Sequence, residues 1–394
     1  MGESVIQKEK KKQRDNPLFS VYFFVGALFN FQYLFEAFSI HIPVVSIFYL
    51  LGFFLIALKF KKDFYINKSL LFFSTIFIGW YLISYLLNFK SEYSNYKVTM
   101  LLTKIIPLLL IGSFLKTRKS VLAFFKGYCY TQIVFIIIVF FICITQINTF
   151  NVNTRLIVGG LNPIWIIRVS YECVLIYFIV LGERGRNLLL LILATLPILY
   201  ATGSKGPFLS FLLVSSLYFI STIKKKYIYL ILIVLGTSIV FISAYVSSNE
   251  ESYITQRFFR AVPDGSSEEI FEESRVVVWP LTLIKMSELD FSRLLFGQGV
   301  GNFSKFYFGR ESDMRYYPHN FFLELAVEQG IGLIIIFFIW IIWFWIKSKN
   351  EFKYIFLFVL INSMFSGDII LNEMIFFYLG LLVNYEEKPK EIIV

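Results

Sequence analysis

The stretch YPHNFFLELAVEQGIG (317–332) marks the point where the one long polar loop of the chain meets an apolar helix. The loop covers 247–318, and His319, one of two histidines in 394 residues, follows it directly. The proline before the histidine and the apolar run after Asn320 predict a helix start, with Glu324 in its first turns. Because most of the remaining chain is apolar, we expect the functional chemistry at this junction.

Composition indicates a membrane protein. The chain is 57% hydrophobic and 20% aromatic with a mean hydropathy of +0.69, more than a soluble core needs. Apolar runs of about 20 residues, the length that crosses a bilayer, recur from end to end. We expect an all-α polytopic membrane protein with about twelve transmembrane helices, of which 187–202, 353–366 and 369–384 are short enough to be re-entrant instead. The predicted segments are 18–36, 40–58, 69–88, 98–115, 121–147, 163–182, 187–202, 206–222, 227–246, 319–346, 353–366 and 369–384.

The basic residues predict the orientation of these helices. Lysine and arginine occupy every second connection in seven segments, as the positive-inside rule requires. This pattern places both termini in the cytoplasm and the long loop outside the plasma (inner) membrane. The predicted organisation is a basic tail (1–17), helices one to nine (18–246), a large extracytoplasmic loop (247–318), helices ten to twelve (319–384) and a second tail (385–394).

The same pattern excludes several function classes. The net charge of +10 arises mostly from cytoplasmic lysines facing anionic lipid, so it needs no nucleic-acid partner. Cys129, Cys143 and Cys173 fall inside predicted helices and are expected to be core residues. No Asp-x-Asp or His-Glu-x-x-His motif is present, and two histidines are few for a metal site, so we expect no metal.

Arginine has the opposite distribution to lysine, since eight of the twelve arginines lie on the predicted outer side. A guanidinium suits bidentate binding of phosphate or carboxylate, although long outer loops also escape the charge rule. Arg155 and Arg168 flank GGLNPIWIIR (159–168), and Arg168 lies inside an apolar helix, where a charge costs about 2.5–3.5 kcal/mol at mid-depth. We expect a functional role for Arg168; the alternative is that its side chain snorkels to the interface.

Two glycine-containing turns are weaker candidates. In TGSKGPFLSF (202–211), Gly203 and Gly206 expose backbone N–H groups at a helix start, and Lys205 adds a charge, which together suit an anion. An ordinary hairpin turn remains the alternative there. FGQGVGNF (296–303) lacks the context of a dinucleotide site and is interpreted as a turn that folds the loop back toward the membrane.

His319 is the main candidate for catalysis. A histidine at a helix N-terminus feels the positive end of the helix dipole, which favours the neutral imidazole that acts as a general base. The alternative is a satisfied interfacial histidine, which is our interpretation of His41. In SRVVVW (274–279), Arg275 lies in the loop, and Trp279 and Leu283 are spaced for an amphipathic segment on the bilayer.

At these residues the chain resembles the O-antigen ligase/polymerase family of integral membrane glycosyltransferases, and the many-helix, large-loop layout extends the likeness to a GT-C-like fold. The matching positions are Ser274, Arg275 and Trp279, then Phe-Gly-x-Gly-x-Gly at 296–301, then His319, Asn320, Leu323, Glu324, Glu328, Gly330 and Gly332.

The resemblance implies transfer of a glycan from an undecaprenyl-diphosphate carrier without metal or other cofactor. His319 would be the base for the acceptor hydroxyl. The diphosphate would be bound by Arg275, Arg155 and Arg168, with Lys205, and the sugars by Trp279, Tyr317, Asn320 and Glu324.

Three activities fit this picture. The first choice is a polymerase that joins lipid-linked repeat units into O-antigen, capsular or other exopolysaccharide, with a flippase and a chain-length regulator of the same pathway as further partners. The second is a ligase that transfers the glycan to lipid A-core or to protein. The third, from a different class, is a flippase or transporter of lipid-linked sugars; the single large loop and the lack of repeat symmetry weigh against it.

Overall fold

The computed structural model describes residues 17–38, 45–59, 66–88, 91–146, 156, 158–159, 161–222, 275–309, 316–348 and 350–384. Within these ranges the chain is helical, and its only β-type contact is an isolated bridge between Val158 and Leu161. The helices and their bounds are α2 (Pro17–Leu28), α3 (Phe31–Ala37), α4 (Val45–Lys59), α5 (Lys68–Leu87), α6 (Glu92–Met100), η1 (Leu101–Ile105), α7 (Ile106–Phe114), α8 (Arg118–Thr145), α9 (Pro163–Leu175), η3 (Ile176–Val180), α10 (Arg186–Thr202), α11 (Lys205–Thr222), α14 (Arg275–Ser287), α15 (Phe291–Phe296), α16 (Phe303–Phe308), α17 (Phe321–Lys347), α18 (Phe352–Ser363) and α19 (Met374–Asn384).

The predicted apolar segments inside the described ranges are largely helical, except that a non-helical stretch at 364–373 separates the helices of the last two. The segment 227–246 and residues 247–274 and 310–315 of the large loop lie outside the described ranges. Five helical stretches are long and apolar enough to cross a membrane, so the chain is a polytopic membrane protein. Twelve crossings and a single outer loop stay predictions. The five stretches are Lys68–Leu87, Glu92–Phe114, Arg118–Thr145, Pro163–Val180 and Phe321–Lys347.

The helix expected at 98–115 begins earlier, at Glu92. Ser91 and Ser94 form a capping box in which each side chain bonds the other residue's backbone N–H, and this satisfies donors at the helix start. The stretch then continues through the π-helical turn η1 into α7. The earlier start places Lys97 inside the bundle, where it is fully buried.

Glycines allow two pairs of helices to pack backbone to backbone. A Cβ atom on Gly26 of α2 would lie 2.0 Å from the carbonyl oxygen of Phe124 in α8. A Cβ atom on Gly380 of α19 would lie 2.1 Å from the carbonyl oxygen of Leu109 in α7. Small residues at such crossings are typical of membrane helices, because they let the backbones approach closely.

α17 is the helix that the opening stretch predicted, and its N-cap is Asn320, whose Oδ1 accepts from the N–H groups of Phe322 and Leu323. A break inside it was not predicted. Gly330 has φ 81° and ψ 168°, a region that in practice only glycine adopts. The break divides α17 into a short first part and a longer second part.

The turn expected at 296–303 is confirmed, and it folds against this break. The N–H groups of Gln298 and Gly299 donate to the carbonyl oxygens of Val327 and Glu328 at 2.8 and 2.9 Å. A Cβ atom on Gly297 would lie 2.4 Å from the Glu328 oxygen, so only glycine fits there. The turn thus satisfies carbonyl groups that the interruption at Gly330 leaves without helical partners.

α18 and α19 are short, with 12 and 11 residues. At 1.5 Å per residue each is about 17 Å long, roughly half of a 30 Å bilayer core. The stretch 366–373 between them, called the 366–373 linker below, is not helical, yet its polar residues are buried. Whether this pair crosses the bilayer or re-enters it, the alternative left open for the short C-terminal segments, stays a prediction. The buried polar residues are Ser366, Asp368, Asn372 and Glu373.

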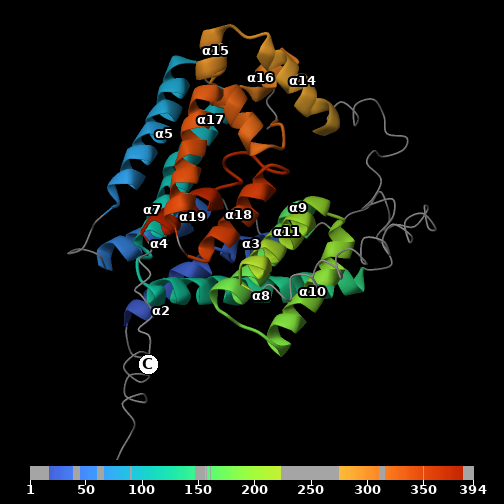
Figure 1. Cartoon of the computed structure of the whole chain (residues 1–394). Helices are drawn as coiled ribbons and strands as arrows, with labels where there is room; N and C mark the ends of the chain where they lie inside the picture. Colours follow the sequence, from blue (N-terminus) through green and yellow to red (C-terminus); the bar gives the residue numbers. More distant parts are fainter. Residues whose placement is uncertain are drawn as a thin grey trace, which may run out of the picture.

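The described part of the large loop consists of three helices, α14, α15 and α16, which gather at one end of the molecule, at the top of Figure 1. α14 is amphipathic as expected: Leu283 and Ile284 are exposed, whereas Val278 and Met286 are buried. Its position on a bilayer surface stays a prediction.

Candidate functional site

The indole of Trp279 joins the two motifs that the sequence singled out. Its Nε1 donates a hydrogen bond of 2.7 Å to the carbonyl oxygen of Pro318, across 39 residues. Trp279 lies on α14, whose neighbouring Val278 is buried against the start of α17 in a second small core. The loop helix is therefore fixed to the backbone next to His319.

His319 has an unusual backbone. Its φ of 54° makes it the one non-glycine residue with positive φ in the described part of the chain. Its ring lies 4.5 Å, between centroids, from that of Tyr317, and Asn320 behind it caps α17. A left-handed non-glycine residue persists only where its surroundings hold it, and such residues cluster at functional sites.

Arg275 is the first residue of α14, one helical turn before Trp279. Residues four apart lie on the same face of a helix. Arg275 is half-buried, and it therefore shares the face that meets Pro318. The structure thus brings Trp279 next to the segment with Tyr317, His319 and Asn320, and Arg275 lies one helical turn from Trp279.

Glu324 faces the interior of the bundle. It is buried and forms an ion pair with Lys97, and its second oxygen accepts from the N–H of Ile369 at 3.0 Å. Lys97 also bonds Glu328 Oε1 at 2.6 Å, one turn further along α17. Both oxygens of the Glu324 carboxylate are thus engaged, and they join α6, α17 and the 366–373 linker.

A second contact anchors the same linker. The hydroxyl of Tyr93 donates to Asp368 Oδ2, and the Tyr93 ring lies 4.7 Å from Lys97 Nζ. Asp368 Oδ1 accepts from the N–H of Leu371 at 2.9 Å. α6, the first part of α17 and the 366–373 linker are therefore held together by buried polar contacts and not by apolar packing alone.

Arg168 lies on the other side of the linker. It is only 2% exposed, its Nη1 donates to Asn372 Oδ1 at 2.8 Å, and its guanidinium lies 4.5 Å from the Trp165 ring. The head group is held inside the protein, so the snorkelling alternative is wrong. Glu172, one turn away, accepts from the Tyr378 hydroxyl at 2.9 Å.

Lys205 begins α11, directly after a turn in which Gly203 has φ 56°. A Cβ atom on Gly206 would lie 3.3 Å from Phe365, so this turn lies against the chain entering the linker. The Arg155 position lies outside the described residues. Leu156, the next residue, donates its N–H to the carbonyl oxygen of Ala201 at 3.0 Å.

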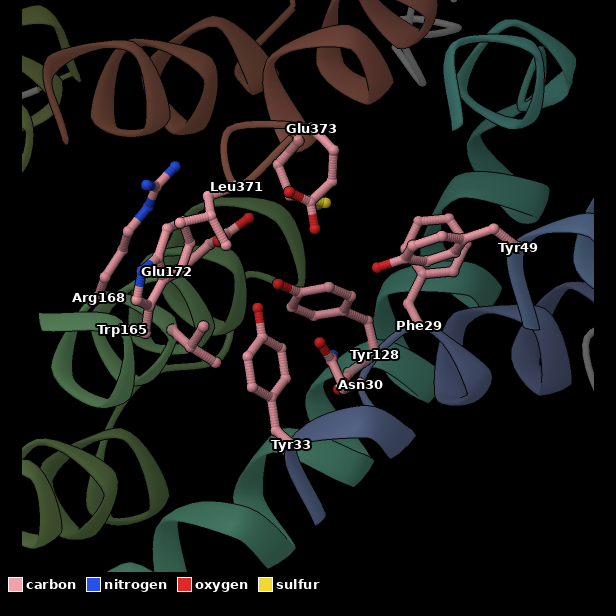
Figure 2. A pocket seen from close by; sticks show the side chains of 12 residues that line it. Phe29, Asn30, Tyr33, Tyr49, Tyr128, Trp165, Arg168, Glu172, Leu371 and Glu373 are labelled. Carbon is pink, nitrogen blue, oxygen red and sulfur yellow. The ribbon is translucent and has the colours of Figure 1, made fainter. Parts of the chain in front are cut away.

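A cavity lies between α3, α4, α8, α9 and the linker (Figure 2). Arg168 and Glu172 line it from α9, and Glu373 lines it from the linker. Glu373 Oε1 pairs with Lys104 Nζ at 3.0 Å, and Lys104 also donates to the carbonyl oxygen of Ile370 at 3.3 Å.

Sequence reasoning missed the partners of these buried charges. The residues concerned are Lys97, Lys104, Glu172, Glu328, Asp368 and Glu373. Each lies within or beside an apolar run, where an ionisable group is costly and marks a functional or paired site. That cost was the available signal, although it does not tell which residue pairs with which.

Comparison with curated proteins found no match. Residues 188–338, which include most of α10, all of α11 and α14–α16, and the first two thirds of α17, match the family model described as O-antigen ligase. The matched part contains Arg275, Trp279 and His319. This match confirms the similarity of the chain to the O-antigen ligase/polymerase family.

Proposed function

We propose that the protein is a membrane glycosyltransferase that transfers a glycan from a polyprenyl-diphosphate carrier to an acceptor hydroxyl on the extracytoplasmic face. The observation that carries the proposal is the hydrogen bond from Trp279 Nε1 to the Pro318 oxygen. This bond places His319, which is half-buried and has a strained backbone, beside α14, the helix that begins with Arg275. A base and a phosphate-binding cation then stand at the junction of loop and membrane, where a lipid carrier presents its sugar.

The reaction is an inverting displacement. His319 removes the proton of the acceptor hydroxyl, whose oxygen attacks the anomeric carbon of the donor. The bond from that carbon to the diphosphate breaks, and the diphosphate leaves on the lipid. General-base help is worth about 10²–10⁴-fold in rate, and the cations that neutralise the departing diphosphate supply a larger electrostatic part. No metal or cofactor is used in this scheme.

The diphosphate is assigned to Arg275, Arg155, Arg168 and Lys205. For Arg168 the support is its burial, since a fully desolvated guanidinium in a membrane protein marks a functional site. Nη1 donates one N–H to Asn372 Oδ1, and the guanidinium has five N–H donors in all. The hydrogen bond to Asn372 therefore orients the Arg168 guanidinium and leaves other N–H groups to bind a phosphate oxygen.

Trp279, Tyr317 and Asn320 are assigned to the sugars, because they surround His319. Glu324 has a different role from the direct substrate contact that we expected, since its oxygens bond Lys97 and Ile369. We assign it to positioning the start of α17 against the linker.

The acceptor decides between polymerase and ligase, and both use the same chemistry. We propose the polymerase, in which a second lipid-linked repeat unit is the acceptor in the plasma membrane. The ligase, with lipid A-core or protein as acceptor, is the second candidate, and the family model that matches 188–338 bears that activity in its description.

The test is an assay with purified protein and purified lipid-linked repeat unit. A polymerase lengthens the glycan and releases free undecaprenyl diphosphate. Lysine in place of Arg275, Arg155 or Arg168 keeps the charge but loses the bidentate fork, so each variant is expected to slow the reaction while the protein remains in the membrane. Translocation of the lipid without any new glycosidic bond would contradict the proposal and favour a flippase.

A further inference from the structure

The cavity beside the 366–373 linker is lined by oxygen atoms from several helices. Tyr33 of α3, Tyr49 of α4 and Tyr128 of α8 contribute hydroxyl groups. Figure 2 shows these hydroxyls and the Glu373 carboxylate pointing toward the same space. Side chains that are far apart in sequence therefore converge on one polar point inside an apolar bundle.

Glu373 provides the clearest sign that a ligand group belongs there. Its residue is 4% exposed, and its Oε1 is paired with Lys104. Among the described residues, none offers a hydrogen bond to its Oε2. A buried carboxylate oxygen without a donor is costly, so the site calls for a group that brings an O–H or N–H.

The charges around the cavity select a neutral group. Arg168 and Lys104 contribute two positive charges, and Glu172 and Glu373 contribute two negative ones. A cation is not needed to balance this set, and a diphosphate at the centre would face two carboxylates at short range. A hydroxyl group, which donates to a carboxylate and accepts from a tyrosine, meets both conditions.

The size of the cavity limits what can enter. The space between the lining atoms is about 340 Å³ with its open side included. Within the whole cavity, the space open to a water-sized group is only that of about one water molecule. It therefore suits one hydroxyl or hydroxymethyl group of a larger ligand and not a complete sugar ring.

We propose that this cavity is a hydroxyl-recognition subsite for the sugar next to the diphosphate of the lipid-linked donor, with Glu373 Oε2 as its acceptor. The inference rests on the proposed function. It follows from the linker, in which Asn372 bonds Arg168, assigned to the diphosphate, and the adjacent Glu373 lines the cavity. The first sugar of the glycan thus lies within reach of the subsite, and Glu373 contributes to donor specificity.

The test compares the binding of two probes to the purified full chain, measured by ligand-dependent stabilisation against thermal unfolding. One probe is undecaprenyl diphosphate without sugar, and the other is the same carrier with the native repeat unit. Glu373→Gln is expected to weaken binding of the glycan-bearing probe about 10- to 100-fold, because a neutral amide replaces the charged acceptor of the ligand hydroxyl. Tyr33→Phe is expected to weaken it about tenfold, because it removes a hydroxyl group from the subsite. Binding of the bare carrier is expected to stay unchanged.

Tyr22→Phe is the matched control, since Tyr22 is a buried tyrosine that does not line the cavity. Should Glu373→Gln fail to fold because Lys104 loses its partner, Tyr33→Phe and Tyr49→Phe carry the test. If the variants bind both probes equally more weakly, or bind both as tightly as the wild type, the subsite proposal is wrong. Unchanged binding of both probes would mean that a structural water occupies the cavity. A separate variant tests the proposed function itself. If Arg275→Lys binds undecaprenyl diphosphate as tightly as the wild type, the proposed function is wrong, whatever the result for Glu373.

Discussion

Trp279 and Pro318 are joined by a hydrogen bond of 2.7 Å from the indole nitrogen to the carbonyl oxygen. The bond holds the peptide group that precedes His319, so it acts on the φ angle of 54° that the histidine adopts. One side chain of α14 thus contacts the backbone directly next to the proposed base.

The first prediction concerns this bond. Trp279→Phe keeps an aromatic ring but removes the N–H donor, at a cost of about 0.5–1.5 kcal/mol. Because the loss falls on the segment that positions His319, we expect transfer to slow by up to about tenfold while the protein level stays normal. Trp343→Phe, at an exposed position on the second part of α17, is the control. Equal rates for the two variants in the purified assay would show that the bond does not position the base.

The second prediction concerns Lys97. Lys97→Met leaves Glu324 and Glu328 buried without their cation, and breaking such a group costs about 3–5 kcal/mol. The unfolding temperature in detergent should therefore fall clearly. Changing both glutamates to glutamine in the same variant should restore part of the loss, because the uncompensated charge is then gone.

Lys119→Met is the control for Lys97, because Lys119 is exposed and two other basic residues remain in its connection. An unchanged unfolding temperature for Lys97→Met would mean that the buried ion pairs do not hold α6 against α17.

The third prediction concerns the break in α17. A Cβ atom on Gly330 would lie 2.2 Å from the carbonyl oxygen of Leu295, and its backbone region costs about 1–3 kcal/mol for any other residue. Gly330→Ala is therefore expected to lower the amount of folded protein. Gly79→Ala has open space around its Cβ and should be tolerated. Comparable yields of the two variants after detergent extraction would refute the close approach of the 296–303 turn.

Local sequence signals predicted the start of α17, because the proline, the Asn320 cap and the apolar run all lie within a few residues. They also predicted α14 as amphipathic and placed SRVVVW (274–279) near the start of α17, and the Trp279–Pro318 bond shows that these two segments lie side by side. That they form one site stays a prediction. These features depend on chain neighbours or on spacing along a single helix.

The buried charge pairs could not be predicted in the same way. Lys97 and Glu324 are 227 residues apart, and the choice of partner depends on how α6 packs beside α17. The break at Gly330 is also a tertiary effect, because it requires the carbonyl groups of Val327 and Glu328 to find donors in the 296–303 turn. A lone glycine in an apolar run does not reveal that partner.

The fourth prediction concerns orientation. With 247–318 outside and both termini in the cytoplasm, Ser266→Cys should react with a membrane-impermeant thiol reagent in whole cells. Lys225→Cys should react only after the cells are opened. The native cysteines Cys129, Cys143 and Cys173 are buried, so their background is expected to be low. The reverse labelling pattern would invert the topology and move the proposed site to the cytoplasmic side.

The central claim is that His319 is the general base, and the most direct measurement is polymer formation from purified lipid-linked repeat unit by His319→Ala, with His41→Ala as the control. Removing a general base costs about 10²–10⁴-fold in rate. We therefore expect His319→Ala to form almost no polymer and still bind the donor, since binding depends mainly on the arginines, while His41→Ala remains close to wild type. A normally expressed His319→Ala protein that builds polymer at nearly the wild-type rate would contradict the assignment.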